Sequence, residues 1–90
     1  MTDRELLEFA AKAAGLRINF HPTASYQWNP LERDDDAHRL ESVLRLDVKL
    51  GTGSVTVGSA TERYSHGDDP AAVKRRAIVR AAAAIGKDLP

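Results

Sequence analysis

The architecture of this chain follows from DDPAAVKRRAIVRAAAAIG, residues 68–86, which predicts a long helix. Asp69 suits the N-cap, where its carboxylate can accept free backbone N–H groups, and Pro70 suits the first helical position. Small and aliphatic side chains recur at helical spacing and predict one buried face. They are Val73, Ala77, Ile78, Ala81, Ala84 and Ile85, with Ala82 beside them. We expect the helix to lie close to a sheet, to run to about Ile85 and to stop at Gly86.

The opposite side of this predicted helix carries a narrow basic stripe of Arg76, Arg80 and Lys87. Two further cations, Lys74 and Arg75, lie beside Arg76 near the helix start. Residues 70–87 contain no acidic residue. Three of the cations lie near the helix start, where the helix dipole disfavours positive charge. Neighbouring Asp68 and Asp69 could hold them there, and so could a phosphate backbone. A solvated charged face is the common alternative.

A β-hairpin is predicted upstream, at LRLDVKLGTGSVTVG, residues 44–58. Apolar Leu44, Leu46, Val48 and Leu50 alternate with charged residues and predict the first strand. GTG predicts the turn, and SVTVG predicts the second strand. ATERY, residues 60–64, predicts a further strand. GTGSVTVG is not a phosphate-binding loop, because no Lys-Ser or Lys-Thr follows and no helix opens after it.

The segment WNPLERDDD, residues 28–36, predicts a corner of the fold. Trp28 is expected to anchor the core, with its indole N–H bonded to a nearby carbonyl. An Asn-Pro step then turns the chain, and Leu31 is expected to pack beneath the next helix as a hydrophobic staple.

That next helix is expected from DDDAHRLESVL, residues 34–44, with Asp34 or Asp35 as its N-cap. Its buried face is predicted to hold Ala37, Leu40, Val43 and Leu44. The aspartate run could instead bind a divalent cation, but no calcium-loop spacing follows it.

A first helix is predicted over residues 2–14, opened by a capping box of Thr2 and Glu5 and closed at Gly15. It is expected to bury Leu6, Phe9 and Ala13. LRINF (16–20) and SYQW (25–28) then predict two strands joined by a turn. The expected product is a single α+β domain over residues 1–90, in the order α-β-β-α-β-β-(β)-α around an antiparallel or mixed sheet.

Composition argues against several functions. Thirteen basic and 13 acidic residues give a net charge of zero, and there is no cysteine. His21, His38 and His66 share no ligand spacing, and no nucleophile motif is present. We therefore expect no enzyme activity, no metal and no cofactor. No apolar run reaches the roughly 20 residues of a membrane helix, and the charged N-terminus does not resemble a signal peptide. A cytoplasmic protein without membrane partners is expected.

Three segments resemble the phage alpha/beta/alpha sandwich domain family. They are MTDRELLEFAAKAAG (1–15), WNPLERDDD (28–36) and DPAAVKRRAIVRAAAAIG (69–86). This resemblance implies a three-layer sandwich and an origin in a phage or prophage, hence the cytoplasm of a host cell. It implies no catalytic activity and no catalytic residues.

The expected function is therefore binding, either to a host or phage macromolecule or to itself, because an alanine-rich core of this size is marginal alone. A second hypothesis is nucleic-acid binding through Arg75, Arg76, Arg80 and Lys87; the later half loosely resembles a double-stranded-RNA-binding domain. A third is nucleotide sequestration, with Trp28 and Tyr26 stacking on the base.

Overall fold

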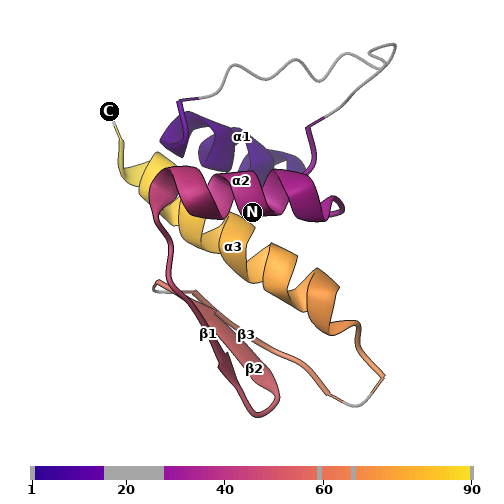
Figure 1. Ribbon diagram of the computed structural model, residues 1–90. Coiled ribbons are helices and arrows are strands. Elements are labelled where there is room, and N and C mark those ends of the chain that lie inside the picture. Colours follow the sequence, from indigo (N-terminus) through magenta and orange to yellow (C-terminus); the bar gives the residue numbers. More distant parts are fainter. Residues whose placement is uncertain (1, 16–27, 59, 66, 90) are drawn as a thin grey trace.

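The computed structural model describes residues 2–15, 28–58, 60–65 and 67–89. These residues form three helices and one antiparallel sheet of three strands, so the fold is α+β as predicted. Figure 1 shows how these elements are arranged. The helices are α1 (Asp3–Ala13), α2 (Asp34–Leu44) and α3 (Pro70–Asp88). The strands are β1 (Val48–Gly51), β2 (Ser54–Val57) and β3 (Ala60–Arg63), in that order across the sheet. The strands predicted at 16–20 and 25–28 lie outside the described residues, except Trp28, which is not in a strand.

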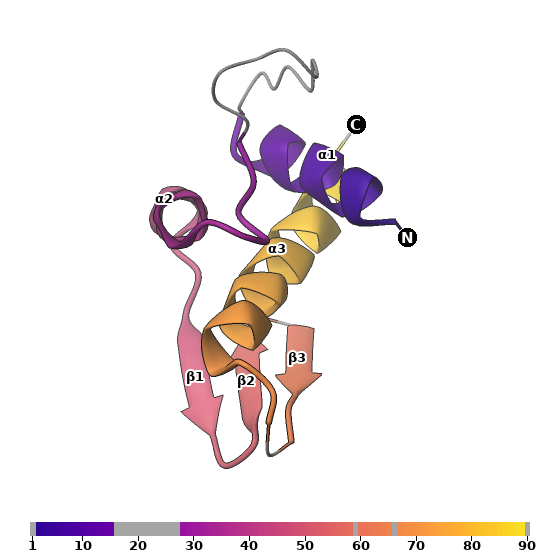
Figure 2. The same cartoon turned by 90° about the vertical axis from the view of Figure 1, so that its right-hand side faces the viewer.

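The described elements form successive layers in which α3 is central (Figure 2). One side of α3 packs on β2 and β3, and other sides contact α1 and α2. Among the described residues, no helix packs on the outer face of the sheet, where Thr56 and Thr61 share a hydrogen bond of 3.2 Å. The described part of the chain therefore accounts for only part of the expected alpha/beta/alpha sandwich.

The capping box at the start of α1 is confirmed. The Thr2 hydroxyl accepts the Glu5 backbone N–H at 3.2 Å, and the Glu5 carboxylate accepts the Thr2 backbone N–H at 3.2 Å. Gly15 follows the helix with a φ of +70°, as a left-handed stop requires. The buried face is rotated from the predicted one: it holds Leu6, Leu7, Ala10 and Ala11. Phe9 and Ala13 are only half-buried, so their predicted burial was wrong.

The predicted stop at Gly86 was also wrong, because α3 continues to Asp88 and Gly86 is buried within it. A Cβ at Gly86 would overlap the carbonyl oxygen of Phe9 and lie 2.7 Å from its carbonyl carbon. This glycine therefore lets α1 and α3 approach backbone to backbone. The Asp69 N-cap and Pro70 at the first turn are confirmed, with Asp69 accepting from Ala71 N at 3.0 Å.

Helix α3 packs against both α1 and the sheet, so its buried surface is wider than the single helical face that the sequence predicted. Its buried side chains are Ala77, Ile78, Val79, Ala81, Ala82 and Ala83. Ala84 and Ile85 are exposed, contrary to the predicted face. The prediction considered only the sheet as a partner, whereas α3 also contacts α1 and α2, so its exposed strip falls on these two residues.

The hairpin of β1 and β2 and the third strand β3 are confirmed. Val55, Val57 and Ala60 point inward and are buried beneath α3. In β1, Val48 and Leu50 lie opposite Val57 and Val55 and so point to the same inner face. Leu50 is nevertheless 74% exposed, since α3 packs over β2 and β3 and leaves β1 at the margin. The alternation therefore predicted the face that Leu50 takes, but that face is not covered at β1.

Helix α2 lacks the predicted aspartate cap. Its N-cap is Arg33, which makes no side-chain capping bond, and the aspartates occupy the first turn instead. The helix ends at Arg45, whose φ of +53° is left-handed. Ala37 and Leu40 are buried as expected, but Val43 is 53% exposed. The buried face of α2 is narrower than predicted because it meets mainly one neighbour, α3.

Candidate functional site

The first basic side chain of interest, Arg75, is held between α2 and α3. Its Nη1 donates to Asp34 Oδ1 at 2.7 Å, and its Nε donates to the carbonyl oxygen of Leu31 at 2.9 Å. Only 15% of the Arg75 side chain is exposed. The guanidinium therefore fixes the corner before α2 to the start of α3, using both edges of its planar donor set.

The next two arginines of α3 share a carboxylate on the sheet. Arg80 Nη1 lies 2.5 Å from Glu62 Oε1, and Arg76 Nε lies 4.0 Å from the same oxygen. Arg76 Nη1 also lies 3.5 Å from Asp3 at the start of α1. Glu62 is 20% exposed, so this pairing is partly shielded from water. These ion pairs join α3 to β3 and α1.

The predicted basic stripe is therefore divided among internal partners. Asp68 and Asp69, one of the explanations considered for the cations near the helix start, have other partners: Asp69 caps α3, and Asp68 accepts the backbone N–H of Ser65 at 2.9 Å. Lys74 and Lys87 are exposed, and neither makes an ion pair with any part of the chain that the structure describes. They are the cations that remain available to a partner.

The three consecutive aspartates have three separate roles. Asp34 pairs with Arg75, as above. Asp35 lies 3.4 Å from Arg33 Nη2, and this hydrogen bond lowers the pKa of the Asp35 carboxyl. Asp36 is buried and accepts the backbone N–H of Asn29 at 2.9 Å, which stabilises the corner. Within residues 2–15, 28–58, 60–65 and 67–89, no cluster of His, Cys, Asp or Glu could hold a metal ion.

The two aromatic residues predicted to bind a nucleotide are Trp28 and Tyr26. Trp28 is 9% exposed and belongs to the core cluster, as predicted for an anchor. Its indole Nε1 is buried and has no hydrogen-bond partner among the described residues, so the expected bond to a carbonyl is not found. Tyr26 lies outside the described residues. Leu31 is half-buried against the core and lines a small hollow with Val73 of α3.

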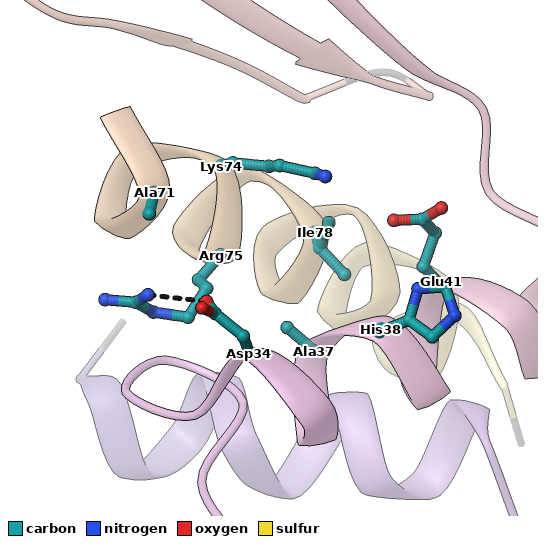
Figure 3. Close-up of a pocket in the computed structure, with 8 residues that line it drawn as sticks. All are labelled: Asp34, Ala37, His38, Glu41, Ala71, Lys74, Arg75 and Ile78. Atoms are coloured by element: carbon teal, nitrogen blue, oxygen red, sulfur yellow. Dashed lines mark hydrogen bonds and ion pairs between the residues drawn. The ribbon is translucent and has the colours of Figure 1, made fainter. Parts of the chain in front are cut away.

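A larger hollow of about 330 Å³ lies between α2 and α3 (Figure 3). Its apolar lining residues are Ala37, Ala71 and Ile78. In Figure 3 the Arg75–Asp34 pair closes one end, and His38 and Glu41 project from α2 at the other. Lys74 completes the rim. The sequence predicted His38 to be a surface residue and did not predict the hollow. The pattern that could have indicated it is His38 and Glu41 three positions apart on one helix, but such pairs are too common to identify a site.

Comparison with known proteins adds no assignment. The chain matches no protein-family model, no curated protein and no solved structure. Within the described ranges, no helix is both long enough and apolar enough to cross a lipid bilayer.

Sequence reasoning also missed two features of the sheet. Glu62 was treated as one residue of an alternating strand, yet it is the carboxylate on which two arginines of α3 converge. The edge position of β1 among the described strands was not anticipated, because alternation predicts which face a side chain takes and not whether another element covers it.

Proposed function

We propose that this chain is a small, non-enzymatic accessory protein of phage or prophage origin that acts by protein binding, with self-association as its first form, in the cytoplasm of the host cell. One observation carries the proposal. Among the described residues, β1 is an edge strand whose inner face presents Leu50 at 74% exposure. An open edge supplies unpaired backbone N–H and C=O groups, and an aliphatic face beside it favours pairing with another chain.

The arrangement of charges supports binding rather than a reaction. Arg75, Arg76 and Arg80 are engaged by carboxylates of α2, α1 and β3, so they act as links between elements. The hollow beside α2 has aliphatic residues in its lining, and its closest charged pair, Asp34 and Arg75, already neutralises itself.

The phage or prophage origin has its support in the resemblance of residues 1–15, 28–36 and 69–86 to the phage alpha/beta/alpha sandwich domain. The complete sandwich, in the order α-β-β-α-β-β-(β)-α, belongs to the same proposal. The described elements from α2 to α3 follow that order.

Sedimentation equilibrium over about 1–300 µM protein tests the proposed self-association. This range detects dimers whose dissociation constants lie between micromolar and millimolar, which corresponds to association free energies of roughly 4–8 kcal/mol. The expected result is a mass that rises with concentration toward that of a dimer. A monomer mass across the whole range would overturn it.

The two alternative functions have weaker support. Nucleic-acid binding through Arg75, Arg76 and Arg80 would have to compete with their ion pairs, and nucleotide stacking on Trp28 would have to displace a core side chain. A gel shift at low salt that disappears when the three arginines are changed to Ala would revive the first. A nucleotide-dependent change in Trp28 fluorescence would revive the second.

A further inference from the structure

We infer that two copies of this chain pair antiparallel through β1, with Val48 opposite Val48 of the second copy, and so join their sheets into one. The inference rests on the proposed self-association and specifies its surface and register. The observations that carry it are the direction of the β1 backbone groups, the order of side chains from Leu46 to Leu50, and the contrast with the other edge strand.

The backbone groups of β1 point outward at the residues that the pairing needs. Tyr64 N–H donates to the carbonyl of Gly53 at 3.0 Å, so the backbone groups of Gly53 face β3. Those of the next residue, Ser54 at the start of β2, therefore face β1, where Ser54 pairs with Gly51. Gly51 therefore directs its backbone groups into the sheet. Since these directions alternate along a strand, Leu50 and Val48 direct theirs to the edge of β1 that no other described strand covers.

These groups match each other across a two-fold axis at Val48. Val48 of each copy donates to and accepts from Val48 of the other copy. Leu50 N–H of each copy meets the carbonyl of Leu46 of the other. The N–H of Leu46 needs no new partner, because it already donates to the Glu41 carbonyl at 2.9 Å.

The side chains in this register are complementary on both faces. The segment Leu46-Asp47-Val48-Lys49-Leu50 reads as apolar, acidic, apolar, basic, apolar. Pairing about Val48 places Leu46 opposite Leu50 on the inner face, where the 74% exposed Leu50 gains an apolar neighbour. On the outer face it places Asp47 opposite Lys49. Both are exposed, and neither has an ion-pair partner among the described residues.

Other registers lose this complementarity. A two-fold axis perpendicular to the sheet keeps each face on its own side, so the centre must fall on a residue. Centring on Lys49 sets two lysines directly opposite each other, which is destabilising. Centring on Leu50 pairs Lys49 with Gly51 and leaves Asp47 without a charged partner.

The second edge strand, β3, is protected in a way that β1 is not. Its inward-facing Glu62 is a charge engaged by Arg80, and its outer face carries Arg63. Inward charges on an edge strand discourage pairing with another sheet. The inner face of β1 is entirely aliphatic, with Val48 half-buried and Leu50 exposed.

The test is sedimentation equilibrium on four proteins: the unchanged chain, Asp47→Lys, Lys49→Asp, and the double variant with both changes. Each single variant places like charges opposite each other twice per dimer, so its dimer should dissociate at roughly tenfold higher concentration or more. The double variant exchanges the two charges and should recover the unchanged dimer. An equimolar mixture of the two single variants should form a heterodimer, because one strand is then basic and the other acidic.

The outcomes separate the two proposals. If the unchanged chain dimerises and both single variants dimerise equally well, the register through β1 is overturned while self-association stands. If the unchanged chain is a monomer throughout, both are overturned. Circular dichroism melting of each variant establishes that it is folded.

A measurement on the unchanged chain covers the case in which a variant does not fold. Hydrogen exchange at the Val48 and Leu50 amides should slow by tenfold or more as protein concentration rises through the dimer transition, while the Lys49 amide, which faces β2, should change far less. Exchange at Val48 and Leu50 that is independent of concentration in a sample that dimerises would overturn the pairing.

Discussion

Replacement of Gly86 by Ala should destabilise the protein even though alanine is the better helix former. Gly86 lies inside α3, and its position faces the backbone of Phe9 in α1. A Cβ there would overlap the Phe9 carbonyl oxygen and stand 2.7 Å from the carbonyl carbon, against 3.4 Å for ordinary contact. The obstacle is backbone and has no rotamer by which to move aside, so α1 and α3 must separate.

The size of the effect follows from two opposing terms. Overpacking a close contact costs about 1–3 kcal/mol, and a rigid backbone neighbour places this case at the upper end or above it. Alanine in place of a helical glycine returns about 1 kcal/mol. We expect a net loss of about 2 kcal/mol in the free energy of unfolding, which lowers the melting temperature by roughly 8–16 °C for a domain of this size.

Urea unfolding followed by circular dichroism measures the loss, and Ala84→Gly in the exposed part of the same helix is the control. The control removes helix propensity without touching α1 and should cost about 1 kcal/mol. If Gly86→Ala raised the melting temperature, the close approach of α1 and α3 would be refuted, because propensity alone would then determine the result.

Three further predictions concern carboxylates. Asp36→Asn should cost about 1–2 kcal/mol, because the amide oxygen can still accept the Asn29 backbone N–H but lacks the negative charge that strengthens this buried hydrogen bond; chemical denaturation measures the loss. Glu62→Gln should cost about 1 kcal/mol by weakening its pair with Arg80, and thermal melting should show a smaller difference from the unchanged chain in high salt. Glu5 has a lowered pKa because the backbone and side chain of the N-cap residue donate to it. Its stabilisation is therefore present above its ordinary pKa and lost as pH falls through the lowered one, so melting of Glu5→Gln should differ from the unchanged chain at neutral pH and converge with it in acid.

Local signals in the sequence predicted the element types and several ends. The Thr2–Glu5 capping box, the Asp69-Pro70 start and the alternation of the hairpin each depend on residues a few positions apart. Their geometry is determined by neighbours in the chain, so a sequence pattern suffices to find them.

The errors concern contacts between distant segments. A glycine at position 86 is compatible both with the end of a helix and with a close approach of another backbone. Only the position of Phe9 in the folded chain distinguishes these two roles. Asp34 or Asp35 was expected to cap α2, and the actual partner of Asp34, Arg75, could not be foreseen because it lies far along the chain. The exposure of Leu50 likewise depends on where α3 crosses the sheet.

The same limit applied to the candidate site. The basic stripe was visible as a charge pattern, but the carboxylates that engage it come from α1, α2 and β3, and no spacing rule connects them. Self-association was expected from the thin core alone, whereas its proposed surface required knowledge of which strand edge is left open.

The central place of α3 has a consequence for biosynthesis. In the order of translation, α3 follows α1, α2 and the sheet, and it is the element against which all of them pack. Until it has emerged from the ribosome, Ala10, Leu40 and Val55 have no common surface to cover them, so the nascent polypeptide must carry its aliphatic residues unburied. Completion of α3 therefore sets the earliest moment at which the protein can escape chaperones and proteases.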